Sequence, residues 1–137
     1  GYYLKGLIQL SQGNSKEAMR YFELSLQVQE NYIPSIILLA QIEEDQGKPG
    51  ALTQRLTAAL KKDDKNTEIL EQLARTSERK GDHHQAIEYW NRLNSINPEY
   101  AQPYLSLTSN YLQISETRKA VTIATHGKNT LPKELRI

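Results

Sequence analysis

The sequence contains no cysteine, which excludes disulfides and thiolate metal sites and leaves the redox compartment unreadable. It also lacks a long apolar run. The longest, IPSIILLA at residues 33–40, is far shorter than the roughly 20 apolar residues of a membrane-spanning helix, so no membrane insertion is expected. Neither sign of charge is in excess, because 17 lysines and arginines face 16 acidic residues. The net charge of +1 predicts no general attraction to phosphate backbones or anionic membranes.

The length of 137 residues suits a single domain, residues 1–137. The sequence begins with GYYLKGL and ends with LPKELRI, both in the middle of a pattern, so we expect a fragment of a longer chain. Cytoplasmic and periplasmic settings are equally compatible with these features. The sequence therefore leaves the localisation open.

An internal repeat of 34 residues runs through the chain without insertion or deletion. Its copies span approximately residues 1–31, 32–65, 66–99 and 100–133. The aligned positions include Gly13, Gly47, Gly81 and Ser115; the small residues Gly6, Ala40, Ala74 and Thr108; and Phe22, Leu56, Trp90 and Ala124. A fixed period of this length is typical of stacked helical repeats.

Each copy predicts two helices separated by a break. In the second copy, Ile36, Leu39 and Ala40 follow helical spacing, Gly47 interrupts it, and Leu56 resumes it. Asn14 with Glu17 and Asp82 with Gln85 predict capping boxes, and Pro49 predicts a first helical turn. The expected helices are residues 2–12, 15–29, 34–46, 50–62, 67–80, 83–95, 101–113 and 117–129.

This pattern resembles the tetratricopeptide repeat (TPR) family over essentially the whole chain. The third copy carries the family's small and large positions at Leu73, Ala74, Gly81, Ala86, Trp90 and Pro98, and the fourth carries Tyr104, Leu107, Tyr111 and Ala120. The first copy departs from the family pattern at Lys5 and Gln9. The resemblance implies an all-α fold, a right-handed superhelical solenoid of about four helix-turn-helix repeats.

The stretch RKGDHHQAIEYW, residues 79–90, looks at first like a metal or acid/base site. His83 and His84 fall at a variable helix entrance of the repeat, and adjacent helical residues point about 100° apart. We therefore expect solvated turn residues rather than a metal site, and Trp90 in the core rather than stacked on a ligand.

Catalytic motifs are absent from the sequence, including GxSxG, HExxH and the phosphate-binding glycine loops. Carboxylate pairs such as Glu43–Glu44 and Asp63–Asp64 have solvated charge as their ordinary interpretation. We expect no enzyme activity in this chain and no cofactor.

The repeat architecture predicts a concave wall formed by the first helix of each repeat. The residues one position beyond each core stripe should face it. The candidate partner-binding residues are Tyr3, Leu7, Ile37, Gln41, Glu44, Glu71, Arg75, Glu78, Leu105 and Ser109. This chemistry favours a peptide or protein partner with apolar anchors around a polar or basic centre. In the other interpretation, Glu71 and Arg75 only form an i,i+4 pair and the apolar members belong to the core.

The sequence also bears on three other partner classes. Members of the resembled family that bind chaperone C-terminal carboxylates do so with a clamp of lysine, arginine and asparagine side chains. The matching positions of this sequence carry none of these residues, so no such clamp is expected; they are Tyr3, Leu7, Leu38, Glu68 and Gln72. Nucleic acid is disfavoured because the third repeat is net negative, although residues 101–137 carry a charge of +3 from five cations and two anions. A structural spacer or self-association module within a larger secretion, envelope or assembly protein remains the alternative.

Overall fold

A computed structural model describes residues 1–135, and all regular secondary structure in them is helical. The helices are α1 (Tyr2–Ser11), α2 (Ser15–Val28), α3 (Ile33–Asp45), α4 (Ala51–Lys62), α5 (Thr67–Arg79), α6 (His83–Ile96), α7 (Gln102–Gln113) and α8 (Thr117–Thr130). Every expected helix is confirmed within one residue at each end. Among these eight, none has the length and apolarity that a bilayer crossing requires.

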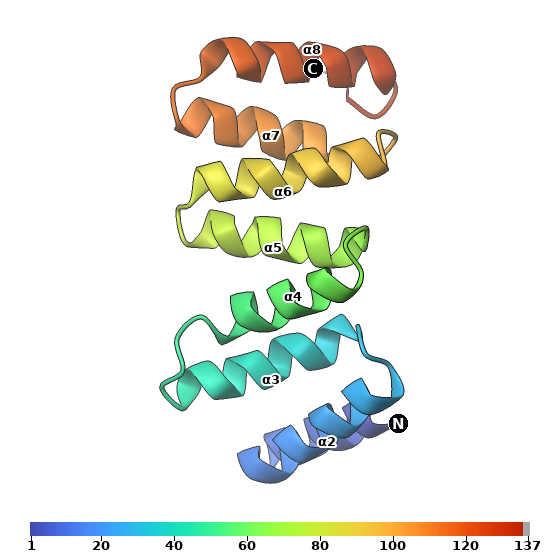
Figure 1. The fold of residues 1–137 in the computed structure, drawn as a ribbon, viewed down its shortest axis with the longest axis vertical. Helices are drawn as coiled ribbons and strands as arrows, with labels where there is room; N and C mark the ends of the chain where they lie inside the picture. Colours follow the sequence, from blue (N-terminus) through green and yellow to red (C-terminus); the bar gives the residue numbers. More distant parts are fainter. Residues whose placement is uncertain (136–137) are drawn as a thin grey trace. The chain divides into compact units, whose positions relative to one another are not determined.

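The helices fall into two compact units, which we call unit 1 (residues 1–63) and unit 2 (from Asp64 onward). Helices α1 to α4 belong to unit 1 and α5 to α8 to unit 2. Within each unit, helices that follow one another in the chain also pack together. Figure 1 shows α5 to α8 in chain order, with each helix reversing the direction of the one before. The division into one domain with four repeats stays a prediction.

Residues with left-handed backbone mark the break inside every helix pair. Gly13, Gly47 and Gly81 have φ values of 78°, 91° and 75°, and Ser115 has a φ of 61° at the corresponding place in the fourth pair. Glycine adopts this conformation without a steric penalty, whereas a serine at positive φ is strained. The alignment of Ser115 with three glycines therefore identifies the turn correctly, at some energetic cost in the last pair.

The core of unit 1 is built where small and large aligned residues meet. Phe22 and Ala18 of α2 are fully buried against Leu39 and Ile42 of α3. A Cβ atom on Gly6 of α1 would lie only 2.5 Å from the Phe22 ring. The small residue at this repeat position is thus required for the close contact between the first two helices.

Unit 2 repeats this arrangement with larger side chains. Trp90 of α6 is fully buried, as expected for the large-residue position of the repeat. Tyr104 of α7 is 1% exposed and packs against Leu131 and Leu135, which follow α8. A Cβ atom on Gly127 would lie 2.7 Å from the Tyr104 ring, so this ring rests directly on the backbone of α8.

Local helix starts agree only in part with the sequence signals. Asp82 caps α6, because its carboxylate accepts a hydrogen bond from the Gln85 backbone N–H at 3.1 Å. The expected box at Asn14 is wrong, because its side chain donates to Gln9 instead of capping α2. The expectation for Pro49 is also wrong, since the left-handed Gly50 intervenes and α4 begins at Ala51.

Candidate functional site

The two α1 candidates contact the core as well as solvent. Tyr3 and Leu7 are half-buried and pack against the core cluster that contains Phe22. The Tyr3 ring centroid lies 5.9 Å from that of Phe22, and 5.4 Å from that of Tyr32 in an edge-on contact. Both residues therefore have a packing role, independent of any ligand.

The α3 candidates form a more open surface on unit 1. Ile37 is half-buried, next to the buried Ile36, while Gln41 and Glu44 are exposed. Gln41 donates a hydrogen bond to Asp45 at 3.2 Å, within the same helix. The Glu44 carboxylate accepts from the Leu52 backbone N–H at 3.4 Å. These contacts are weak or local, so both side chains remain accessible to a ligand.

The α5 candidates are part of a larger arrangement that we call the unit 2 polar cluster: Glu71, Arg75, Glu78, Trp90, Tyr100 and Asn110. Arg75 donates to Glu71 at 3.1 Å, and its guanidinium carbon lies 5.5 Å from the Trp90 ring centroid. The side chains of Arg75 and Glu71 are 40% and 22% exposed. Arg75 is thus held by an ion pair and a cation–π contact, and still reaches the surface.

Tyr100, in the loop before α7, fixes the other side of Glu71. Its hydroxyl donates to Glu71 Oε1 at 2.7 Å. This hydrogen bond, followed by burial and the negative charge of Glu71, raises the pKa of Tyr100 above its ordinary value. The phenol therefore stays protonated at neutral pH and acts as a donor.

Glu78 connects three helices through one oxygen atom. The Trp90 indole N–H donates to Glu78 Oε2 at 3.2 Å, and Asn110 Nδ2 donates to the same atom at 2.6 Å. Asn110 is 2% exposed and also donates to the Ser106 backbone carbonyl at 2.7 Å. Because its donors come from buried residues, the Glu78 carboxylate is held in one orientation.

His83 differs from the sequence expectation. It is half-buried, and its Nδ1 lies 2.8 Å from Asn110 Oδ1. A carbonyl oxygen only accepts, so Nδ1 carries the hydrogen and donates. His84, in contrast, is exposed as expected. In the described part of the chain, no three histidine, aspartate or glutamate side chains are grouped so that they could hold a metal ion.

The α7 candidates line an apolar hollow of about 230 Å³ on unit 2, which we call the α7 hollow. Leu105 and Ser109 are exposed, and Leu112 on the same face is 53% exposed. The remaining walls are Tyr104, Thr108, Ala124 and Leu135. Leu105 and Leu112 expose apolar surface to water, so an apolar side chain of a partner that covers them would remove that surface from water.

The sequence reasoning missed Tyr100, Asn110 and the hydrogen-bonding role of Trp90. One signal was available for Asn110. The repeat places Ile42 and Thr76 at the same position, and all three residues are buried. An amide in a slot that other copies fill with isoleucine or threonine requires polar partners. Glu78 and His83 are those partners.

Comparison with known families agrees with this architecture. Residues 1–32 and 67–100 match the sequence profile of the tetratricopeptide repeat. No curated protein sequence matches the chain. These two stretches carry tetratricopeptide repeats, and the eight paired helices of the described residues fold as an all-α helical repeat solenoid, as in solved structures of tetratricopeptide repeat proteins.

Solved structures share the fold at low sequence identity. MamA is 21% identical with a TM-score of 0.65, over 93% of this chain and 74% of MamA. A tetratricopeptide repeat protein from Parabacteroides merdae is 21% identical with a TM-score of 0.69, over 96% of this chain and 53% of that protein. YrrB is 19% identical with a TM-score of 0.64, over 98% of this chain and 69% of YrrB. The fold and the matched repeats are those of repeat scaffolds for protein interaction, which are typically not enzymes.

Proposed function

We propose that this scaffold binds a peptide segment of a partner protein along the first helices of its repeats. The single observation that carries the proposal is the α7 hollow, where the candidates Leu105 and Ser109 border a concave apolar surface. YrrB is described as a TPR protein with an unusual peptide-binding site, which supports peptide binding by a related fold. Ile37, Gln41 and Glu44 are proposed to contact a peptide of the same class on unit 1.

Affinity comes from an apolar anchor in the α7 hollow. Leu105 and Leu112 are 48% and 53% exposed, so a partner side chain that covers them removes apolar surface from water. At about 25 cal/mol per Å² of buried apolar surface, this contribution is on the order of 1–3 kcal/mol for one well-placed anchor. An apolar anchor surrounded by polar contacts is the usual form of a binding hot spot.

Partner choice comes from the unit 2 polar cluster. Helix α5 carries three carboxylates, Glu68, Glu71 and Glu78, against two guanidiniums, Arg75 and Arg79, so that it is net negative. Hydrogen bonds from Tyr100, Trp90 and Asn110 hold the Glu71 and Glu78 carboxylates in place before a ligand arrives. A fixed negative surface favours a basic residue next to the anchor, and it gives specificity more than affinity.

Two other ligand classes do not suit the first helices. The Tyr3 and Leu7 side chains offer no cation for a terminal carboxylate, so an acidic C-terminal tail should not bind by the clamp mechanism. Nucleic acid should not bind the net negative α5 surface. We further propose that the chain acts without catalysis or a cofactor.

Peptide selection tests this function. A library of random peptides is selected against the chain, and enriched peptides should pair a leucine, isoleucine or phenylalanine with a nearby lysine or arginine. Calorimetry then compares the affinity of one enriched peptide for Leu112→Ser and for Val121→Ser. Val121 is 60% exposed on α8 and serves as the matched apolar control.

Leu112→Ser should weaken binding by about tenfold or more, while Val121→Ser should leave the affinity unchanged. If both variants lost affinity equally, or if only Val121→Ser lost affinity, peptide binding on the first helices would be contradicted. If no peptide is enriched and sedimentation shows a concentration-dependent dimer that Leu112→Ser disrupts, the self-association alternative replaces the proposal.

A further inference from the structure

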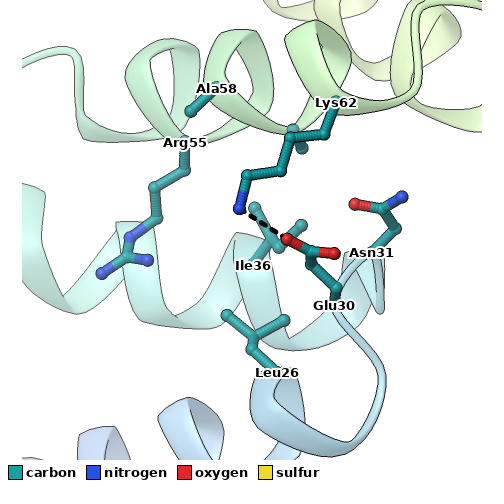
Figure 2. A pocket seen from close by; sticks show the side chains of 8 residues that line it. Leu26, Glu30, Asn31, Ile36, Arg55, Ala58 and Lys62 are labelled. Carbon is teal, nitrogen blue, oxygen red and sulfur yellow. Dashed lines mark hydrogen bonds and ion pairs between the residues drawn. The ribbon is translucent and has the colours of Figure 1, made fainter.

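Unit 1 contains a second hollow, away from the α3 candidates, which we call the α2–α4 hollow. It has a volume of about 220 Å³ and lies between α2, the start of α3 and α4 (Figure 2). Its apolar walls are Leu26, Ile36, Ala58 and Ala59. Glu30, Asn31, Arg55 and Lys62 provide the polar part of the lining. Small-molecule pockets are usually larger, about 300–1,000 Å³, so this volume suits a single side chain.

The corresponding place in unit 2 is filled by the chain itself. Two repeat steps after Ile36 stands Tyr104, and two steps after Ala58 and Ala59 stand His126 and Gly127. The Tyr104 ring centroid lies 5.7 Å from that of His126, and the ring packs on the Gly127 backbone. The Tyr104 hydroxyl donates to the Pro98 carbonyl at 2.7 Å.

Differences in side-chain size explain why the place is open in unit 1. Ile36 is shorter than Tyr104 and is itself 3% exposed, so it forms the floor of the space instead of filling it. Ala58 supplies only a methyl group where unit 2 has the His126 ring. Tyr104 thus shows that this position of the repeat can accommodate a phenol ring.

One polar atom of the α2–α4 hollow needs a donor. Asn31 Oδ1 is buried and has no hydrogen-bond partner among the described residues. Figure 2 shows the Asn31 side chain directing this oxygen toward the space above Ile36. Asn31 aligns with Glu99 in unit 2. The residue before Glu99 is Pro98, whose carbonyl accepts a hydrogen bond from the Tyr104 hydroxyl. A buried acceptor without a donor costs free energy, so an occupant that donates is favoured over a purely apolar one.

The mouth of the hollow can open easily. Lys62 on α4 pairs with Glu30 across it at 2.6 Å, and both side chains are more than 60% exposed, at 68% and 64%. Exposed pairs of this kind contribute little to stability and rearrange readily. Arg55 is held separately: burial lowers its pKa, but hydrogen bonds and charge from Glu43 and Glu23 outweigh that effect and raise the pKa overall.

We propose that the α2–α4 hollow receives a tyrosine side chain of a partner protein. The ring lies against Leu26, Ile36 and Ala59, and the hydroxyl donates to Asn31 Oδ1. This site involves unit 1 and its second helices, so it does not depend on peptide binding at the α7 hollow. Together the two hollows would let one chain recognise two different side chains.

The test uses p-cresol, which is the isolated side chain of tyrosine, and toluene, which lacks only the hydroxyl. Both are titrated into the ¹⁵N-labelled chain and followed by amide chemical shifts. The p-cresol should shift the signals around Asn31 and Ile36 and bind about fivefold to tenfold more tightly than toluene, because one hydrogen bond separates them. Without a donor requirement, toluene would bind better, since it loses no hydration of a hydroxyl.

Two variants place the response at the hollow. Ile36→Tyr combined with Ala59→Gly copies the residues of unit 2, so the chain should fill its own hollow and lose the p-cresol response. Ala58→Leu narrows the mouth from an exposed position and should weaken p-cresol binding even if the double variant folds poorly. Asn31→Ala should abolish the advantage of p-cresol over toluene.

Three results would overturn the proposal. The first is the absence of any p-cresol response in the wild-type chain. The second is toluene binding as tightly as p-cresol, which would make the hollow a site for a plain apolar side chain. The third is a response that persists unchanged in Ala58→Leu and in the folded double variant, which would place binding elsewhere.

Discussion

Units 1 and 2 are built from the same repeat but are stabilised differently. Unit 2 fills the first large position of its last helix pair with Tyr104 and connects three helices through Glu78 and Asn110. Unit 1 has the shorter Ile36 at the matching position, and its surface carries exposed ion pairs such as Lys62–Glu30, which contribute little to stability. The difference shows that small residues and turns specify the fold, whereas the positions at which the copies differ create the surfaces available to partners.

The largest effect should come from removing the side chain that joins the core of unit 2 to its polar cluster. Trp90→Ala should lower the unfolding free energy by about 3–5 kcal/mol, because it leaves a cavity and deprives Glu78 of a donor. Urea denaturation measures the loss. Trp90→Phe keeps most of the buried ring, so its loss should be clearly smaller; equal losses would show that the cavity does not matter.

A single methyl group tests the close packing of Tyr104. Gly127→Ala improves helix propensity by about 1 kcal/mol but places a Cβ 2.7 Å from the Tyr104 ring. The overpacking should outweigh the gain in helix propensity and lower the unfolding free energy by on the order of 1–2 kcal/mol. Thermal unfolding measures this change. The reverse change in unit 1, Ala59→Gly, should cost no more than about 1 kcal/mol, as expected from backbone entropy alone. A gain in stability for Gly127→Ala would contradict the packing.

Alkaline pH should weaken the unit 2 polar cluster selectively. Since the pKa of Tyr100 is raised in the folded state, its contribution to stability is complete below its ordinary pKa and is lost as the pH rises through the higher folded value. Near neutral pH the unfolding free energy of the wild type should exceed that of Tyr100→Phe by about 1 kcal/mol. Denaturation of both proteins at pH 7 and above pH 10 measures this difference, which should shrink at high pH. A constant difference would show that the hydrogen bond to Glu71 is not its source.

The smallest effect is expected at the mouth of the α2–α4 hollow. Lys62→Ala removes an exposed ion pair and should change the unfolding free energy by less than about 0.5 kcal/mol. Thermal unfolding at low and high salt provides the measurement. A loss above about 1 kcal/mol would mean that unit 1 depends on this pair and that the mouth does not open easily.

The sequence was sufficient for the fold because the fold depends on features that repeat. Gly13, Gly47, Gly81 and Ser115 mark the turns through their backbone conformation, and the small position at Gly6 is defined by its contact with Phe22. Both signals are local or recur every 34 residues. They could therefore be read without knowing which helices touch.

The candidate site was less predictable, because its contacts do not follow the repeat. Glu78 meets Asn110 across two helices, and this pairing depends on how α5, α6 and α7 pack. The sequence offers Glu71 as a local partner of Arg75, but it gives no sign of the Trp90 ring, which Arg75 also contacts. Replacing Arg75 should therefore lower the unfolding free energy by more than the loss of an exposed ion pair alone. The sequence predicts a solvated His83 for the same reason: its partner Asn110 lies on another helix.

The most direct test of peptide binding on the first helices is site-specific photocrosslinking. A benzoylphenylalanine is placed at Ser109 on α7 or, as a control, at Thr125 on α8, both of which are exposed. A selected peptide is then added and the sample is irradiated. Peptide binding on the first helices should give a crosslinked product from position 109 and none from position 125. Crosslinking from position 125 alone would contradict binding on the first helices and assign it to the second helices.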